Sequence, residues 1–225
     1  MTEFGALTVE ELFAYALREG FDEIGDDEWA PGVSAIVELQ HRGDRAALER
    51  SIELLSSVHP IERRLGVQVL AEIREHPRAI EPGWMSESVE SLLQLADREE
   101  DVAVLAEVAR AFGYRGDHRA IPVLLRWVGH PAQPVRFGVA SSLASLGNAS
   151  SAEAADVERV LLCLAEDESG AVRDYALWSL NERGHMSEAV LAAMDAHDDD
   201  PDKSPAREAR RGLRRLGEDL DWDDD

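Results

Sequence analysis

A pattern that recurs five times along the chain restricts the fold more than any other feature. In its clearest copies, Val-Arg is followed by small or apolar residues four and five positions later, and by apolar residues at plus eight and plus eleven. The copies begin near residues 62, 101, 135, 172 and 205, at intervals of 39, 34, 37 and 33 residues. Offsets of four, eight and eleven fall on one face of an α-helix. The pattern therefore predicts five amphipathic helices. Several copies end in a glycine, which we expect to stop the helix in the left-handed conformation: Gly113, Gly147, Gly184 and Gly217.

A second helical segment precedes several of these copies. The stretches "SESVESLLQLADRE", "AIPVLLRWVGHP" and "ADVERVLLCLAEDE" each place apolar residues at helical spacing. No β-branched alternating run of useful length interrupts them. The chain is therefore predicted to be all-α. Helix pairs that recur every thirty to forty residues cannot bury both faces alone, so they are expected to stack into a solenoid.

The motifs "AIPVLLRWV…PVRFGVASSLASLG" and "AVRDYALWSLNERG" resemble HEAT repeats, including the bacterial kind similar to the bilin-lyase helical repeats. The resemblance extends over roughly residues 44–217. It implies a right-handed α-solenoid of about five HEAT-like helix pairs. We expect residues 1–43 to form an N-terminal helical cap, whose first helix begins with a Thr8–Glu11 capping box and stops at Gly20. Residues 218–225 are expected to form an acidic C-terminal tail.

Charge and cysteine content narrow the function classes. The chain carries 46 acidic and 23 basic residues, for a formal net charge of −23. This acidity disfavours nucleic-acid binding and favours a basic partner. A proteome-wide bias towards Arg and Asp is an equally weighted alternative, because Lys203 is the only lysine. The chain has one cysteine, no secretory-type N-terminus and no apolar run of about 18 residues, so we expect a soluble cytoplasmic protein without a membrane segment.

The sequence offers no catalytic or metal-binding spacing. None of the seven histidines is followed by Glu, unlike the iron-binding motif of deoxyhypusine hydroxylases, which have HEAT-like folds. The stretch "DDDPDKSPARE" has Lys203 and Ala209 where a calcium loop needs Gly and Glu, so a solvated acidic loop is expected there. Cys163 lies in an apolar helix and is predicted to be buried. We expect no catalytic residue, no metal and no cofactor. A bilin-lyase-like or DNA-glycosylase-like HEAT enzyme remains the alternative.

Arginines recur at the same first-turn position of three copies, at Arg63, Arg136 and Arg173. They are compatible with a cationic track for an acidic ligand. The favoured interpretation is structural: each arginine hydrogen-bonds an Asp or a backbone carbonyl of the adjacent repeat and stiffens the stack.

In HEAT solenoids the second helix of each pair lines the concave side, so residues off the apolar stripe of these helices are candidates for binding. Aromatic side chains at such positions are typical of interface hot spots. Ordinary packing between repeats is the competing interpretation, with Tyr175 as its best candidate. The predicted partner-binding residues are Phe137, Ser141, Asp174, Tyr175, Trp178, Glu182 and Glu107.

These observations predict a non-catalytic scaffold or adaptor. Its acidic, aromatic-studded concave face would bind a basic or helical protein segment. One version is an inhibitor or immunity-type protein that masks a basic toxin or nuclease. The partner is expected to be another protein, with no nucleic acid and no membrane.

Overall fold

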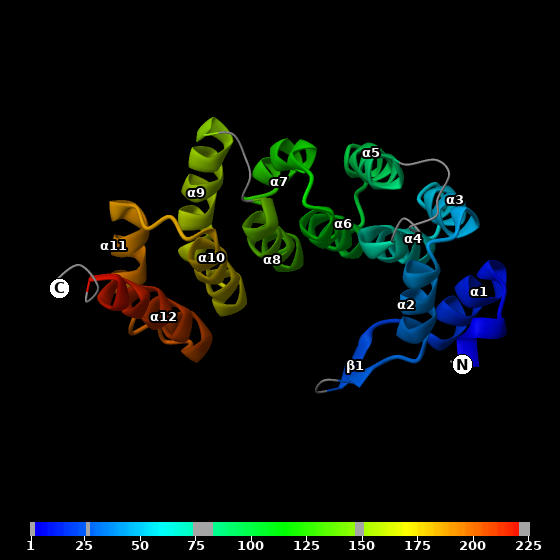
Figure 1. Cartoon of the computed structure of the whole chain (residues 1–225), viewed down its shortest axis with the longest axis horizontal. Coiled ribbons are helices and arrows are strands. Elements are labelled where there is room, and N and C mark those ends of the chain that lie inside the picture. The colour runs from blue at the N-terminus through cyan, green and yellow to red at the C-terminus, as the bar shows by residue number, and fades with distance from the viewer. Residues whose placement is uncertain (1–2, 26–27, 74–82, 147–150, 221–225) are drawn as a thin grey trace. The chain divides into compact units, whose positions relative to one another are not determined.

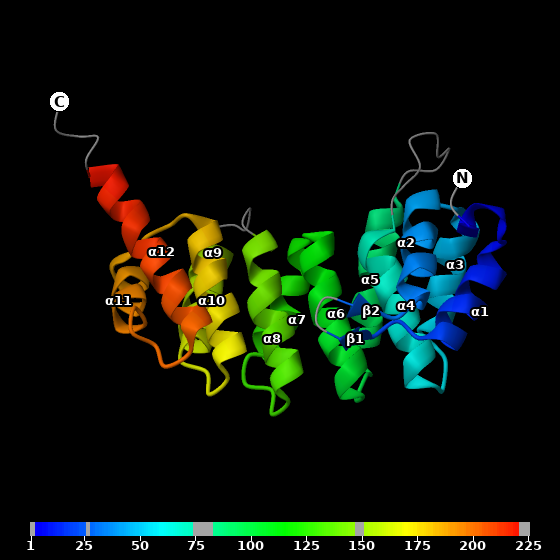
Figure 2. The same cartoon turned by 90° about the horizontal axis from the view of Figure 1, so that it is seen from below.

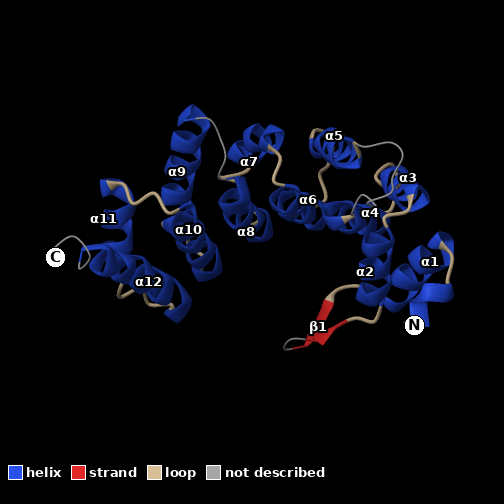
Figure 3. Cartoon of the chain, in the orientation of Figure 1, coloured by secondary structure: helices blue, strands red, loops and turns tan. Residues whose placement is uncertain are grey.

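A computed structural model describes residues 3–25, 28–73, 83–146 and 151–220. The described residues contain twelve α-helices and one short antiparallel hairpin (Figure 1; Figure 3). The chain divides into two compact units, residues 1–115 and residues 116–225. In the part that the structure describes, no helix is both long and apolar enough to cross a membrane.

The first unit begins with an N-terminal helical segment. The 3₁₀ helix η1 (Glu3–Ala6) leads into α1 (Val9–Glu19), the strands β1 (Glu23–Gly25) and β2 (Glu28–Trp29), and α2 (Gly32–Arg42). The predicted capping box is present at α1: Thr8 accepts from the Glu11 amide, and the Glu11 carboxylate accepts from the Thr8 amide at 2.8 Å. The hairpin was not predicted, because strands of three and two residues are too short to show alternation.

Two helix pairs complete the first unit. They are α3 (Arg45–Leu54) with α4 (Pro60–Glu72), and α5 (Trp84–Ala96) with α6 (Val102–Arg115). Within this unit α4 and α6 pack against one another, and α3 contacts α5, so first and second helices form separate layers (Figure 1). Arg115 joins the second-helix layer by donating to the carbonyl of Ala71 at 2.6 Å and to that of Ile73 at 3.2 Å.

The second unit contains three more pairs, beginning with the 3₁₀ helix η2 (His118–Ala120). The pairs are α7 (Ile121–Arg126) with α8 (Gln133–Ser142), which continues into the 3₁₀ helix η3 (Leu143–Leu146), then α9 (Ser151–Ala165) with α10 (Gly170–Arg183), and α11 (Glu188–Ala196) with α12 (Lys203–Leu220). Helix α10 packs against both α8 and α12 (Figure 1; Figure 2). The predicted repeat starts at 62, 101, 135, 172 and 205 therefore each lie within two residues of the start of a second helix.

The predicted stop glycines behave differently from one another. Gly184 ends α10 at φ 69°, and Gly20 ends α1 at φ 76°, both at the positive φ that favours glycine. Gly113 is a wrong prediction, because it lies buried inside α6 and the helix continues to Arg115. Gly217 is also wrong, since α12 continues to Leu220 and includes the first residues of the predicted tail. Gly147 and residues 221–225 lie outside the described residues.

Two further expectations about side-chain exposure are corrected. Cys163 is exposed on α9, because it points away from the stripe of Val157, Val160 and Leu164 that packs inwards. The acidic loop before α12 is not wholly solvated: the Asp200 side chain is 2% exposed and pairs with Arg173. The predicted domain boundaries at residues 43 and 217 stay predictions.

Candidate functional site

Three predicted aromatic residues meet on the second-helix layer of the second unit. Phe137 lies on α8, and Tyr175 and Trp178 lie on α10. The ring centroids of Phe137 and Tyr175 are 4.6 Å apart at an interplanar angle of 63°, and those of Tyr175 and Trp178 are 5.8 Å apart at 62°. These are edge-to-face contacts, the favoured geometry for aromatic pairs. We call Phe137, Tyr175 and Trp178 the aromatic cluster.

Helical spacing explains why these rings remain near the surface. Tyr175 and Trp178 are three residues apart, so they lie on the same face of α10, while Val172 and Ala176 are buried on the inward stripe. Phe137 and Trp178 are half-buried, and Tyr175 is 37% exposed. The competing interpretation named Tyr175 as the residue most involved in packing between repeats. Tyr175 does bridge the two helices, but it is also the most exposed ring of the cluster.

The polar residues predicted beside the aromatic cluster have local partners. Glu182 is exposed on α10 and forms an ion pair with Arg211 of α12 at 2.5 Å. Ser141 is half-buried on α8 and donates to the carbonyl of Gly138 at 3.1 Å. Because Arg211 already pairs with Glu182, the face is less acidic on its α12 side than the sequence suggested.

Asp174 lies at the border between α10 and α12. It is half-buried, and its Oδ1 has no hydrogen-bond partner among the described residues. Burial raises the pKa of this carboxyl group, the nearby carboxylate of Glu208 raises it further, and Arg207 acts in the opposite direction. Because Oδ1 itself is buried, this atom is not accessible to a partner at the surface.

Glu107 does not have the exposure expected of it. It lies on α6 in the first unit, is only 7% exposed, and forms an ion pair with Arg110 at 2.6 Å. The spacing rule treated it as groove-facing, but ten of the fourteen residues of α6 are buried. Burial between packed helices therefore explains the difference.

The recurring arginines form the structural contacts that the sequence favoured. Arg136 donates to Asp167 at 2.6 and 3.0 Å, and Arg173 donates to Asp200 at 2.8 and 2.7 Å. Arg63 makes the same two-bond contact with Glu99, at 2.6 and 2.7 Å. Each acidic residue lies in the turn of the following helix pair. The arginines are therefore engaged in contacts between repeats.

A second contact gives these arginines a common geometry. Each donates to the carbonyl six residues before itself, on Ser57, His130 and Asp167 respectively. Asp167 thus accepts from Arg136 through its side chain and from Arg173 through its backbone. This relay links the turns before α8, α10 and α12 within the second unit. Spacing in the sequence identified the arginines, but not the acidic partners, which lie 27 to 36 residues away.

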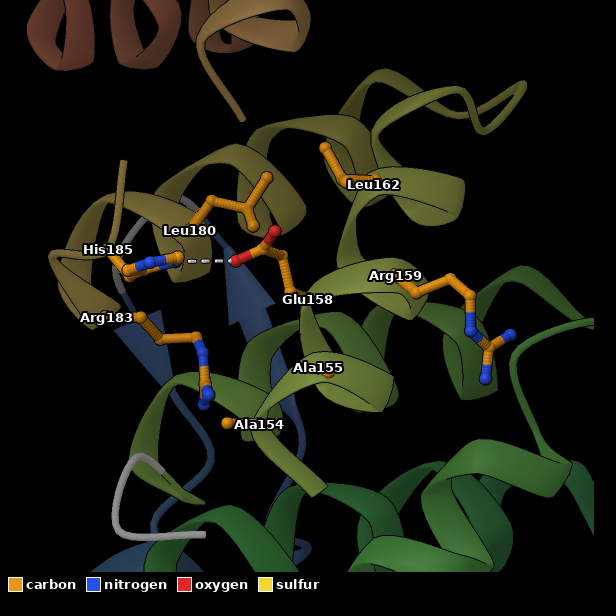
Figure 4. Close-up of a pocket in the computed structure, with 8 residues that line it drawn as sticks. All are labelled: Ala154, Ala155, Glu158, Arg159, Leu162, Leu180, Arg183 and His185. Atoms are coloured by element: carbon orange, nitrogen blue, oxygen red, sulfur yellow. Dashed lines mark hydrogen bonds and ion pairs between the residues drawn. The ribbon is translucent and has the colours of Figure 1, made fainter. Parts of the chain in front are cut away.

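A cavity of about 610 Å³ lies between α9 and the end of α10 (Figure 4). Glu158 and His185 face one another there, with 2.9 Å between the carboxylate and Nδ1, and Ser187 donates to the same carboxylate at 2.7 Å. Burial lowers the pKa of the nearby Arg183 guanidinium, and Glu158 partly counters that effect. The sequence did not indicate this cavity, because its lining comes from two helices and a turn. Among the described residues there is no group of three or more His, Cys, Asp or Glu side chains that could hold a metal ion.

Comparison with known proteins agrees with this architecture. Residues 89–157 match the family model of HEAT repeats. The Escherichia coli protein YibA is similar in structure, with a TM-score of 0.71 and 19% identity over 94% of this chain and 71% of YibA. A designed armadillo repeat protein in complex with the peptide (KR)4 has a TM-score of 0.59 and 14% identity, over 92% of this chain and 96% of the designed protein. A second designed armadillo repeat protein has a TM-score of 0.58 and 15% identity, over 92% and 91% of the two chains.

No curated protein matches the sequence. The family match and the structural neighbours nevertheless agree with a chain built of repeated helix pairs. The chain therefore has a helical-repeat fold similar to that of HEAT and armadillo repeat proteins, and its residues 89–157 match HEAT repeats.

Proposed function

We propose that this protein is a non-catalytic scaffold or adaptor that binds another protein through the second-helix face of its second unit. Helical-repeat proteins commonly present extended surfaces to protein or peptide partners. The observation that carries the proposal is the aromatic cluster, in which a 37%-exposed tyrosine is held between two half-buried rings on adjacent helices. Aromatic residues held rigidly at a surface are typical anchors of interfaces.

The partner segment is proposed to be basic or helical. The formal net charge of −23 attracts a basic partner over long range. A basic partner is supported by the designed armadillo repeat protein of similar fold, whose structure is a complex with the peptide (KR)4. Arg and Lys side chains also bind the faces of Tyr and Trp rings, which suits the aromatic cluster. An inhibitor or immunity-type protein that masks a basic enzyme is one version of this function.

A pull-down with matched variants tests the proposal. The tagged full-length chain, a Tyr175→Ala, Trp178→Ala variant and a Tyr114→Ala control are incubated with native lysate, and captured proteins are identified by mass spectrometry. Tyr114 is a suitable control because it is an exposed tyrosine, at 64%, on α6 outside the cluster. We expect a basic protein to be captured by the wild type and by the control, but lost from the double variant.

Folding and salt provide the internal checks. All three baits should have the same helical circular dichroism spectrum, and capture should weaken as NaCl is raised, because salt screens charge attraction. Identical captured proteins for all three folded baits would remove the aromatic cluster from the binding surface. An acidic captured protein would contradict the charge preference while leaving the scaffold proposal intact.

A further inference from the structure

Helix α12 concentrates positive charge in an otherwise acidic chain. Six of the 23 basic residues lie in its first thirteen positions: Lys203, Arg207, Arg210, Arg211, Arg214 and Arg215. The only acidic residue in that stretch is Glu208, which is 7% exposed and lies against α10. The net charge of this stretch of α12 is therefore positive, whereas that of the whole chain is negative.

Four of these residues form a single row. Lys203, Arg207, Arg210 and Arg214 follow one another at intervals of four, three and four, which places them on one face of the helix. All four are exposed, on the face opposite the buried Pro205 and Gly212. At 1.5 Å per residue the row is about 16 Å long. We call these four residues the α12 cationic stripe.

Arg211 and Arg215, the two arginines of this stretch outside the stripe, make close contacts within the fold, whereas the contacts of the stripe are weaker. Arg211 pairs with Glu182 at 2.5 Å and with Glu208 at 3.0 Å, and Arg215 donates to the carbonyl of Asn181 at 3.0 Å. These arginines hold α12 against α10. The recorded ion pairs of the stripe are longer, at 3.7 Å from Arg207 to Glu208 and 3.8 Å from Arg210 to Asp199. In both pairs the arginine side chain is more than half exposed, and a pair of this length with an exposed partner contributes little to stability.

The positive charges of the stripe also destabilise α12 itself. Its first turn contains Lys203 and no acidic residue, although the positive end of the helix dipole favours carboxylates there. Like charges four residues apart repel one another, as at Lys203 and Arg207 and again at Arg210 and Arg214. A feature that opposes local stability and has only long ion pairs to compensate indicates a role outside the fold.

We propose that the α12 cationic stripe binds an acidic segment of a protein partner, through side chains other than those of the aromatic cluster. Charge complementarity identifies the occupant, because four cations in a 16 Å row suit three or four carboxylates at helical or extended spacing. Two exposed acidic residues lie near the row: Asp202 comes just before α12, and Asp199 is 3.8 Å from Arg210. The formal net charge of −23 disfavours a nucleic-acid backbone, whose affinity depends on neutralising many phosphates, so a short acidic peptide is the favoured occupant. The protein would then present two surfaces of different chemistry.

A binding experiment with a defined probe tests this proposal. Fluorescence polarisation measures the affinity of the full-length chain for a labelled ten-residue oligoglutamate peptide at 50 mM NaCl. The test variant is Arg207→Ala, Arg210→Ala, Arg214→Ala, and the matched control is Arg18→Ala, Arg126→Ala, Arg159→Ala, which removes three exposed arginines elsewhere. We expect the Kd to rise about tenfold in the test variant and less than about twofold in the control.

Stability separates loss of binding from loss of folding. The test variant should melt at the same temperature as the wild type or higher, because it removes like-charge repulsion and introduces the best helix former. Equal affinities of wild type and test variant for the peptide, or no affinity in either, overturn the proposal. Stripe-dependent binding of a ten-nucleotide oligo-dT that is tighter than that of the peptide would instead assign the stripe to nucleic acid. A dimer in light scattering that the test variant abolishes would assign it to a second copy of the chain.

Discussion

At the scale of single residues, the repeated arginine makes the main ionic contact between one helix pair and the next. The Arg136 and Asp167 side chains are 9% and 8% exposed, and Asp167 also accepts from the backbone amide of Ser169. Burial alone would raise the pKa of Asp167, but the hydrogen bonds from Arg136 and the backbone hold it below its usual value. A pair this buried is costly to break from one side, because the remaining charge loses its partner.

We therefore expect Arg136→Ala to lower the free energy of unfolding by about 3 kcal/mol, since it leaves the buried Asp167 carboxylate unpaired. Urea denaturation followed by circular dichroism measures the change. The control is Arg159→Ala, whose pair with Asp156 is 71% and 53% exposed and should cost less than about 1 kcal/mol. Adding Asp167→Asn to Arg136→Ala should recover part of the loss. Equal effects of the two arginine variants would contradict a stabilising role for the buried pair.

At the scale of elements, close approach of two helices depends on a small residue. Gly66 lies on α4 where it meets α3, and a Cβ built there would be 2.6 Å from the backbone oxygen of Ser51. Backbone cannot move aside as a flexible side chain can, so the helices would have to separate. The repeat pattern placed a small residue at this position, and the structure shows which contact requires it.

Gly66→Ala should lower the free energy of unfolding by about 1 to 3 kcal/mol, even though alanine favours helix formation. The matched control is Gly129→Ala, because a Cβ at Gly129 meets nothing within 4 Å. Thermal and urea unfolding of both variants measure the two changes in the free energy of unfolding. A Gly66→Ala protein as stable as the Gly129→Ala protein would show that α3 and α4 can separate at little cost.

At the scale of the whole molecule, the arginine contacts occur in both units and give the chain a shared sensitivity to acid. Hydrogen bonds from Arg173 hold the pKa of Asp200 well below its usual range, with further help from the Asp202 amide and His197. Burial raises the pKa of Glu99, as it does that of Asp167, but hydrogen bonds from Arg63 and from backbone amides keep the pKa of Glu99 below its usual value. The unfolded chain therefore takes up protons at these groups before the folded chain does.

Stability should accordingly be fully present above about pH 5 and should fall as the pH drops below about 4, through the unfolded and then the folded pKa values of these carboxyls. Urea midpoints at pH 7, 5, 4 and 3 measure this dependence. Loss of net negative charge on acidification acts in the opposite direction, so an Asp200→Asn variant is compared in parallel. Its stability should decline less steeply below pH 4; an identical slope would show that Asp200 is not a source of the acid sensitivity.

The sequence predicted more of the fold than of the candidate site. Repeat starts, the capping box at Thr8 and the helix stop at Gly184 follow from spacing within a single helix, so they could be found without the structure. The aromatic residues Phe137 and Trp178 were also found from helical spacing, and their contacts with Tyr175 agree with that placement. Their role in binding stays a prediction.

What the sequence determined by itself is the periodic part: an all-α chain of helix pairs with an arginine at a fixed first-turn position. What only the tertiary structure decided is which side chains meet between elements. It buried Glu107 beside Arg110, exposed Cys163, paired Glu182 with Arg211 and joined Arg173 to Asp200. The physical reason is that helical periodicity depends on neighbours within about four residues, whereas these contacts and exposures depend on how one helix packs against another.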